Sequence, residues 1–270
     1  MVDLDIGVIF THESGLMSRL IDSMHASGDG LRMRLILVDN NSKQGVEPWS
    51  RRFDETKIVY NENRLTYAQN VNRVLASSSA RYILLMNTDM FFDPFQQCLA
   101  KMVAFMDANP RCGVSGCRLY YANGTDTRPA RRFQTLRTIL GRRCGMAGCF
   151  RGSLDRYMYR EHSPDETWQC DWLSGCFLMV RREAFEQVGG LDEGFGKYFE
   201  DVDFCLRMTR AGWLVMYHGA TSCFHLERRA SKKLWSADAW EHLRSYIRFL
   251  RKWGWRPGRI VTDPLPIAKP

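Results

Sequence analysis

Three acidic residues within four positions form the densest group of ionisable side chains in this sequence. Glu200, Asp201 and Asp203 begin a segment with helical spacing of its apolar residues, after a glycine-rich, aromatic turn over residues 194–199. The helix dipole favours acids at a helix start by about 0.3–1 kcal/mol each, which would account for one or two of them. Three acids beside an apolar turn repel one another unless a cation or a substrate proton is bound. The cluster therefore indicates general-base or cation-binding chemistry.

Polar residues follow three predicted strands at the points where the strands end. Residues 5–10, 31–38 and 81–86 are short apolar segments that run into Thr11-His12-Glu13, Asp39-Asn40-Asn41 and Asn87-Thr88-Asp89. In open α/β sheets, ligands bind beyond the carboxyl ends of the strands. The same residue types also form ordinary loops and helix caps, and the sequence supports both interpretations about equally. No Walker loop and no G-x-G-x-x-G motif occurs, which argues against a P-loop kinase or a dinucleotide-dependent dehydrogenase.

Strands and helices alternate through the first half, as is typical of an α/β fold with crossover helices. Helices are predicted over residues 15–26, 67–76 and 93–108, the last opened by the capping sequence Asp93-Pro94-Phe95-Gln96, and residues 57–60 are predicted to form a further strand. In the second half, we expect strands at 177–180, 214–217 and 221–224, and helices from residue 182 and over 200–212.

The formal net charge of +8 is concentrated near the end of the chain, where residues 227–259 hold ten Lys or Arg against three acids. A second group of arginines lies between residues 124 and 171, either as a loop over an anionic ligand or as a solvated surface. The longest apolar runs are far shorter than the ~20 residues of a transmembrane helix. The first residues lack the basic start of a secretory signal. A soluble or peripheral protein is expected.

Nine cysteines, an odd number spread through apolar segments, argue against a disulfide framework and for a reducing compartment. Cys112 and Cys117, and likewise Cys144 and Cys149, form C-x4-C pairs. This spacing exceeds that of the usual zinc knuckle, and no pair of histidines accompanies it. Buried, unreactive thiols are the preferred interpretation.

Six stretches follow one another in an order and spacing that resemble a known enzyme family. They are Val38-Asp39-Asn40-Asn41-Ser42, Leu84-Leu85-Met86-Asn87-Thr88-Asp89, Trp172-Leu173-Ser174-Gly175-Cys176, Gly189-Gly190-Leu191-Asp192-Glu193-Gly194-Phe195, Glu200-Asp201-Val202-Asp203-Phe204-Cys205-Leu206-Arg207, and His225. The set covers roughly residues 4–252 and resembles family 2 glycosyltransferases of the GT-A fold, in the branch that contains bacterial rhamnosyltransferases and galactofuranosyltransferases.

The resemblance implies an α/β fold with a mixed, mostly parallel sheet and helices on both faces. Residues 1–235 would form the catalytic domain, with a nucleotide-binding half over about 1–110 and an acceptor-side half over about 111–235. Residues 236–270 would form a basic amphipathic helix and tail.

For the donor, the resemblance implies a nucleotide-diphosphate sugar at the strand ends. Asp39 would contact the base or ribose, with Thr11 and Glu13 nearby, and Asn87 and Thr88 would lie at the nucleotide as well. The segment over residues 63–70 lacks the glycine that the family often carries there.

For the metal, the resemblance implies a divalent cation, Mg²⁺ or Mn²⁺, which would neutralise the charge of the leaving group. Asp89 would be a direct ligand and His225 the second protein ligand. Asn87 stands in place of the first acid of the family's metal motif, so one charge is missing there.

For catalysis, the resemblance makes Asp201 the general base that takes the proton of the acceptor hydroxyl. Trp172, Ser174, Gly175 and Glu200 would line the pocket for the donor sugar and the acceptor. One carboxylate base, without a second nucleophile on the opposite face, fits single displacement with inversion at the anomeric carbon.

The expected function is metal-dependent, inverting transfer of a sugar to a hydroxyl of a lipid-linked glycan, in bacterial surface polysaccharide or O-antigen synthesis. L-rhamnose from dTDP-rhamnose is the first choice of sugar and donor. The alternatives are galactofuranose, galactose or glucose from a UDP donor, a sugar nucleotidyltransferase, and an inactive membrane-docked scaffold.

A basic amphipathic helix is predicted at the end of the chain, with Ser236 as its cap and Lys252 near its end. One side carries Trp240, Leu243, Tyr246, Ile247, Leu250 and Trp253, and the other Arg244, Arg248, Arg251 and Lys252. This helix can dock on the catalytic domain, bind anionic lipid, or do both. The expected location is cytoplasmic, peripheral at the cytoplasmic face of the inner membrane. No nucleic-acid partner is expected, because no binding module is present.

Overall fold

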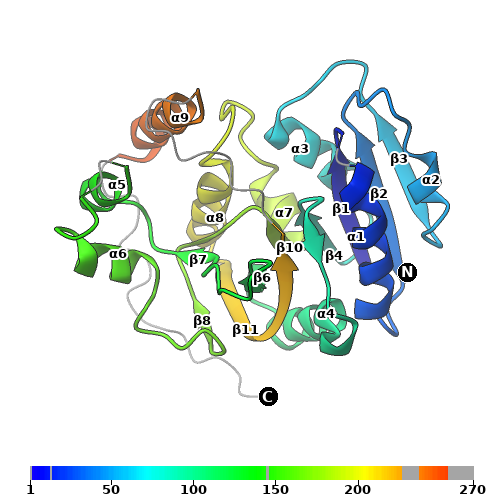
Figure 1. Cartoon of the computed structure of the whole chain (residues 1–270), viewed down its shortest axis with the longest axis horizontal. Helices are drawn as coiled ribbons and strands as arrows, with labels where there is room; N and C mark the ends of the chain where they lie inside the picture. Colours follow the sequence, from blue (N-terminus) through cyan, green and yellow to red (C-terminus); the bar gives the residue numbers. More distant parts are fainter. Residues whose placement is uncertain (1, 13, 144–145, 227–236, 255–270) are drawn as a thin grey trace.

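The computed structural model describes residues 2–12, 14–143, 146–226 and 237–254. In this part of the chain, nine strands form one sheet in the order β3-β2-β1-β4-β10-β6-β11-β5, with β8 paired to β11 (Figure 1). They are β1 (Leu4–Phe10), β2 (Met33–Asp39), β3 (Thr56–Tyr60), β4 (Tyr82–Met86), β5 (Met90–Phe91), β6 (Cys112–Tyr120), β8 (Thr167–Gln169), β10 (Phe177–Arg181) and β11 (Leu214–His225). A separate ribbon pairs β7 (Ala130–Arg131) with β9 (Trp172–Leu173).

The first strands are parallel and the later ones mixed. β1 lies between β2 and β4, parallel to both, so the chain order switches direction at β1. Ligands bind beside such a switch point in α/β sheets. β10 is antiparallel to β4 and β6, whereas β6 and β11 are parallel. The prediction of an α/β fold with a mixed, mostly parallel sheet is confirmed.

Helices cover both faces of the sheet, because successive residues of each buried strand point to opposite sides. On β2, Leu35 and Leu37 belong to the same buried cluster as residues of the helices over 14–27 and 98–108, whereas Ile36 and Val38 belong to the cluster that contains residues of the helix over 67–77. The helices are α1 (Ser14–Ser27), α2 (Glu47–Ser50), α3 (Tyr67–Ser77), the 3-10 helix η1 (Pro94–Gln96), α4 (Cys98–Ala108), α5 (Leu136–Arg143), α6 (Arg151–Tyr157), α7 (Arg182–Val188), α8 (Glu200–Arg210) and α9 (Ala237–Trp253).

The structure corrects the predicted elements in two places and adds a long strand, β6, that was not predicted. The helix expected over residues 93–108 is broken at Gln97, whose φ of 47° separates η1 from α4. The two strands expected at 214–217 and 221–224 are one strand, β11, with an irregularity between His218 and Ser222. β6 was not predicted, because Gly113 and Gly116 interrupt its apolar run; Gly113 lies so close to Trp213 that a Cβ there would be 2.7 Å from the Trp213 Cβ.

The apolar stripe predicted for α9 is divided between residues that pack on the rest of the protein and residues that stay exposed. Tyr246 and Phe249 are buried against Phe199, with ring centroids 5.5 and 5.4 Å from the Phe199 ring. Trp240 and Leu243 stay 61% and 43% exposed, and Ile247 is exposed as well. The predicted cap Ser236 lies outside the described residues. None of the helices in the described ranges combines the length and the apolar character needed to cross a membrane.

Candidate functional site

The ends of β1 and β2 bring two predicted nucleotide contacts side by side. Phe10 and Asp39 are paired in the sheet, so Thr11 follows β1 next to the end of β2. Asp39 is 7% exposed, and its Oδ1 accepts a hydrogen bond from the Ser42 amide at 2.8 Å. Glu13, predicted to lie nearby, is outside the described residues.

Buried amide side chains hold the loops behind these strand ends. The Nδ2 group of Asn61 donates to the Oδ1 atoms of Asn40 and Asn70, at 3.0 and 2.6 Å. Asn40 Oδ1 also accepts from the Leu65 amide at 2.8 Å. Asn40 therefore orders the segment before α3, which begins with a capping box formed by Thr66 and Gln69.

Asp89 and His225 meet at the far end of β4. β5 begins one residue after Asp89, and its pairing with β11 sets Met90 opposite His225. The Leu226 amide donates to the Asp89 carbonyl at 2.8 Å, and His225 Nε2 lies 3.2 Å from Asp89 Oδ1. Asn87, which precedes this turn, donates its amide to the Cys176 carbonyl at 3.2 Å. Two residues far apart in the sequence are thus brought together, as the metal prediction requires.

The contact between Asp89 and His225 fits a metal site. Although the two atoms are close, their geometry is not that of a hydrogen bond, and among the described residues the buried Nε2 atom has no hydrogen-bond partner. Buried polar atoms are almost always satisfied, so the structure leaves this nitrogen in need of a ligand. An imidazole nitrogen and a carboxylate oxygen both bind divalent cations.

The turn before α8 is held in a strained backbone conformation. Tyr198 and Phe199 have φ values of 71° and 70°, which cost side-chain-bearing residues ~1–3 kcal/mol each. Helix α9 supports the turn: Ser245 Oγ donates to the Lys197 carbonyl at 2.7 Å, and Phe199 is 2% exposed beneath α9. The strain sets the direction in which the first residues of α8 leave the turn.

Asp201 lies across from the loop after β9. Its Oδ2 accepts from the Gly175 amide at 2.9 Å and its Oδ1 from the Val202 amide at 2.8 Å. Tyr67 on α3 donates to the Gly175 carbonyl at 2.8 Å, which fixes the loop. Burial raises the pKa of Asp201, and the two amide donors and the positive charge of Arg131 oppose that rise. These groups favour the ionised form that a general base needs.

Glu200 is the neighbouring acid and has a different environment. It is 8% exposed, and its Oε2 atom is buried without a hydrogen-bond partner among the described residues. Burial, and then the charge of Asp201, raise the pKa of Glu200 to about 8. Since the two carboxyls interact, they titrate as a pair, and burial together with the charge of Asp201 favours a state in which the pair keeps a proton.

The raised pKa of Glu200 predicts a pH-dependent effect on stability. Between its ordinary pKa of 4.5 and its folded pKa of about 8, the folded protein holds a proton that the unfolded chain releases, so the free energy of unfolding falls as pH rises. A glutamine at this position has no proton to release, so the stability of Glu200→Gln should not fall in this way as pH rises. The variant should therefore be more stable than the wild type at pH ~8, by on the order of 2 kcal/mol, and should differ little from it near pH ~5. Denaturant unfolding at both pH values measures this. The exposed Glu183→Gln is the control, and a Glu200→Gln effect that is equal at both pH values would contradict the assignment.

Asp203, the third clustered acid, turns away from the other two. It is completely buried and accepts hydrogen bonds from Arg207 Nε at 2.9 Å and from Trp253 Nε1 at 2.8 Å. The Lys252 ammonium lies 2.8 Å from its Oδ1. Asp203 therefore ties α9 to α8 and has a structural role.

The predicted sugar pocket combines loop and core residues. Ser174 Oγ accepts from the Cys176 thiol at 3.3 Å, and Gly175 presents its amide to Asp201. Trp172 is 9% exposed, and its Nε1 donates to the Arg132 carbonyl at 2.8 Å. The Trp172 ring thus belongs mainly to the wall that supports the loop.

Arg131 is a site residue that the sequence analysis did not single out. It is paired with Trp172 in the β7–β9 ribbon, and its guanidinium donates to the Thr127 and Ala130 carbonyls, both at 3.1 Å. Its charge acts on Asp201. The only signal in the sequence was the group of arginines between residues 124 and 171, in which nothing distinguishes Arg131 from its neighbours.

Comparison with known proteins agrees with this arrangement. The sequence profile of glycosyl transferase family 2 matches residues 5–189. The chain belongs to glycosyltransferase family 2. The predicted resemblance to this family is confirmed.

Two curated relatives and one solved structure show where this glycosyltransferase lies in the family. N-acetylglucosaminyl-diphospho-decaprenol L-rhamnosyltransferase of Mycobacterium tuberculosis is 28% identical over 240 residues, which cover 82% of this chain and 76% of that protein. O-antigen biosynthesis protein RfbC of Myxococcus xanthus is 27% identical over 261 residues, 92% of this chain but only 19% of RfbC. The mannosyltransferase PcManGT from Pyrobaculum calidifontis, solved with GDP-Man and Mn²⁺, superposes with a TM-score of 0.63 at 16% identity, over 92% of this chain and 64% of that one. The fold is that of the GT-A glycosyltransferases.

Proposed function

We propose that this glycosyltransferase transfers L-rhamnose from dTDP-rhamnose to a hydroxyl of a lipid-linked glycan in the synthesis of a bacterial surface polysaccharide. The name of the mycobacterial relative, which matches across 82% of the chain, supports the sugar and the lipid-linked acceptor. The observation that carries the reaction type is the carboxylate of Asp201, which is half-buried and accepts a hydrogen bond from the Gly175 amide at 2.9 Å. This arrangement fits a base for an acceptor hydroxyl.

We infer that transfer depends on a divalent cation held by Asp89 and His225, with Asn87 and Thr88 beside the donor phosphates. The unsatisfied Nε2 of His225 at 3.2 Å from Asp89 supports the assignment. The cation would neutralise the negative charge of the departing diphosphate. The nucleoside would be bound by Thr11, by Asp39 and by the end of β2. We also propose that the nucleotide-binding half of the chain ends, and the acceptor-side half begins, near residue 110.

In the proposed reaction, Asp201 accepts the proton of the acceptor hydroxyl as its oxygen attacks the anomeric carbon. The bond from that carbon to the diphosphate oxygen breaks on the opposite side, so the nucleoside diphosphate leaves with the electron pair and the configuration inverts. The protonated Glu200 beside Asp201 donates rather than accepts hydrogen bonds, which suits the binding of a sugar hydroxyl. The pocket for the donor sugar and the acceptor would be shaped by Gly175, Ser174 and Trp172.

A panel of nucleotide sugars tests the proposed donor. With Mg²⁺ or Mn²⁺ present, dTDP-rhamnose should be hydrolysed slowly to dTDP in the absence of acceptor, and faster than UDP-galactofuranose, UDP-galactose or UDP-glucose. Coupled detection of the released nucleoside diphosphate measures this. Preference for a UDP-sugar would reject rhamnose, release of pyrophosphate would indicate a nucleotidyltransferase, and no binding of any donor would indicate an inactive scaffold.

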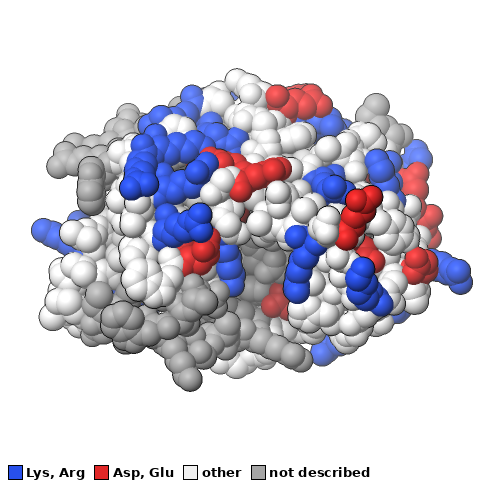
Figure 2. Space-filling view, turned by 90° about the horizontal axis from the view of Figure 1, so that it is seen from above, with Lys and Arg blue, Asp and Glu red and all other residues white. Residues whose placement is uncertain are grey.

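We further propose that α9 contacts the cytoplasmic face of the inner membrane, where the lipid-linked acceptor would be found. Figure 2 shows Lys and Arg side chains gathered on the α9 side of the molecule, with acids among them. A hollow of about 1020 Å³ beside α9 is lined by exposed apolar residues (Trp240, Leu243, Ile247) together with Arg244 and Arg251, and the acids Asp192, Glu193 and Glu241 also line it. Apolar and cationic groups side by side suit an anionic lipid.

The structure sharpens which basic residues should be tested for membrane binding. Arg248 and Lys252 bind Asp192 at 3.0 and 2.7 Å, so reversing their charges would disturb the fold. Arg244→Glu with Arg251→Glu should instead weaken binding to vesicles that contain anionic lipid by roughly thirtyfold or more, since each cation contributes ~1 kcal/mol. Vesicle sedimentation measures the binding, and turnover of a short soluble acceptor should persist.

The matched control reverses two exposed cations on other elements, Arg51→Glu with Lys101→Glu. It keeps the same change in net charge and should bind vesicles several-fold more tightly than the α9 variant. Equal loss in both variants would mean that total charge, and not the α9 surface, determines binding.

A further inference from the structure

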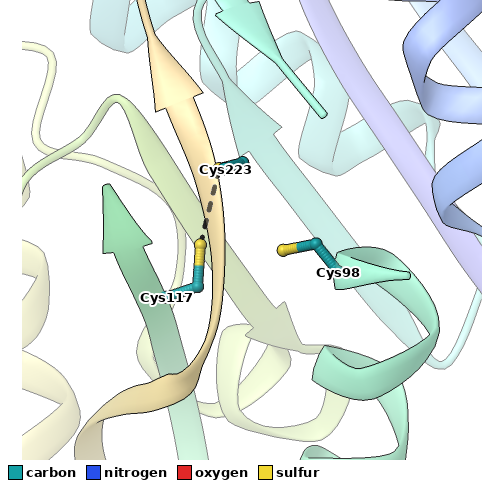
Figure 3. Close-up of side chains that lie close together, drawn as sticks. All are labelled: Cys98, Cys117 and Cys223. Atoms are coloured by element: carbon teal, nitrogen blue, oxygen red, sulfur yellow. Dashed lines mark hydrogen bonds between the residues drawn. The ribbon is translucent and has the colours of Figure 1, made fainter. Parts of the chain in front are cut away.

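Three cysteines from distant parts of the chain meet in the core on the α4 side of the sheet. Cys98 opens α4, Cys117 lies on β6 and Cys223 on β11, and all three are completely buried. Their sulfur atoms point toward one another and lie within 4.8 Å, with 3.5 Å between those of Cys117 and Cys223 (Figure 3). Among the described residues, no other three His, Cys, Asp or Glu side chains converge in this way.

Burial alone does not account for this convergence. Cys112, Cys170 and Cys205 are as deeply buried, yet none of them joins such a group. The Cys112 thiol, expected to be a partner of Cys117 in any zinc pair, instead donates to the Val114 carbonyl at 3.4 Å. The neighbours of Cys117 are therefore Cys98 and Cys223, which form no recognisable sequence motif with it.

The separations between the sulfur atoms match those of ligands that share one cation. A zinc–sulfur bond is about 2.3 Å, so two sulfurs on one tetrahedral zinc lie ~3.8 Å apart. The observed separations, from 3.5 Å to at most 4.8 Å, bracket this value. Small side-chain movements would bring all three sulfurs to bonding distance.

The surrounding backbone is arranged to present these thiols. Cys98 is the first residue of the eleven-residue helix α4, after Gln97 in the left-handed conformation, and a helix N-terminus favours a thiolate. The irregularity in β11 between His218 and Ser222 shifts the pairing so that Cys223 lies opposite Leu119, two residues beyond Cys117. Thr221, 1% exposed, has a hydroxyl near Cys98 that makes no hydrogen bond of ordinary geometry with the described residues.

We propose that Cys98, Cys117 and Cys223 bind one thiophilic divalent cation of the zinc class, with the fourth ligand position facing Thr221. Binding replaces the thiol protons, which go to solvent, and changes no oxidation state. This site is separate from the proposed hard-cation site, because soft thiolates select zinc and its relatives whereas Mg²⁺ and Mn²⁺ prefer oxygen. Cys223 and His225 are two positions apart on β11, so a cation here would brace the strand that carries His225.

The test begins with metal uptake during folding, since the completely buried sulfurs are reached only when the chain opens. Full-length protein carrying Cys149→Ser, which removes an exposed thiol, is unfolded, refolded with or without Zn²⁺, and freed of loose metal. Zinc per chain is measured by elemental mass spectrometry, and Cd²⁺ serves as a second probe through its thiolate charge-transfer absorption. Cys98→Ser and Cys117→Ser are compared with the buried control Cys170→Ser and with His225→Ala.

One zinc per chain is expected in the Cys149→Ser parent, in Cys170→Ser and in His225→Ala, together with a metal-dependent rise in Tm. Cys98→Ser and Cys117→Ser should retain less than about a tenth of that zinc and lose the rise in Tm. The proposal would be overturned if the parent bound no zinc, or if Cys98→Ser bound as much zinc as the parent. It would also be overturned if the metal-free parent were lighter by two hydrogens, because that mass would reveal a disulfide. If the serine variants do not fold, the cadmium spectrum of the parent decides: thiolate absorption supports the site and its absence rejects it.

Discussion

Alanine in place of Asp89 or His225 should lower glycosyl transfer by a factor of about 10³ or more, because each change removes one of the two proposed protein ligands of the cation. His225 Nε2 lies 3.2 Å from the Asp89 carboxylate but makes no hydrogen bond with it. Replacing either side chain by alanine therefore removes no hydrogen bond between the two. Both variants should therefore fold. Binding of dTDP, measured by calorimetry with and without Mn²⁺, should lose its dependence on the metal.

Matched controls separate loss of the metal from general damage near the strand ends. Asp93→Ala removes a nearby carboxylate that caps η1, and His25→Ala removes an exposed imidazole that contacts the Arg52 carbonyl. Both should keep most of the activity and the metal-dependent binding of dTDP. Full activity of the wild type in excess chelator, or metal-dependent dTDP binding in His225→Ala, would contradict the assignment.

The sequence was sufficient to predict the features that depend on local chemistry. The strand-end clusters around Asp39 and Asp89 could be found because buried strands have a short apolar pattern and ligands bind at their carboxyl ends. The pairing of Asp89 with His225 came from the resemblance to a family, since no local rule connects residues 136 positions apart; the short pairing between β5 and β11 is what brings them together.

The remaining features depend on packing between distant segments. Arg131 reaches the site only because β7 pairs with β9, and two-residue strands have no recognisable pattern. The thiol cluster requires the break at Gln97 and the irregularity in β11, neither of which the sequence signals. The division of the α9 stripe follows from the position of Phe199, which only the tertiary structure supplies.

The three clustered acids show why sequence alone could not assign their roles. At the start of a helix they look alike, but they point in different directions around it. Asp203 meets Arg207, Lys252 and Trp253, so Asp203→Asn should act mainly on stability, at a cost of about 3 kcal/mol or more for leaving buried charges unpaired. Glu200 and Asp201 remain as candidates for the base, and their environments distinguish them.

Asp201→Asn should lower kcat by a factor of about 10² or more, with donor affinity nearly unchanged. Asparagine keeps the size of the side chain and can still accept the hydrogen bond from the Gly175 amide, now 2.9 Å from Asp201 Oδ2, so the loop after β9 should stay in place. What is lost is the ability to take a proton. Single-turnover rates with dTDP-rhamnose and a lipid-linked acceptor measure the effect, and thermal unfolding checks that the variant remains folded.

Glu200→Gln is the decisive comparison, because it changes the neighbouring acid in the same way. The pKa of Glu200, raised to about 8, keeps this side chain protonated at neutral pH, and a neutral amide should therefore replace it with a smaller loss of kcat. In the wild type, the rate should fall at low pH as the carboxylate of Asp201 is protonated, and this dependence should be absent from Asp201→Asn. An inactive Glu200→Gln together with an Asp201→Asn variant of near wild-type rate would move the base by one residue, to Glu200.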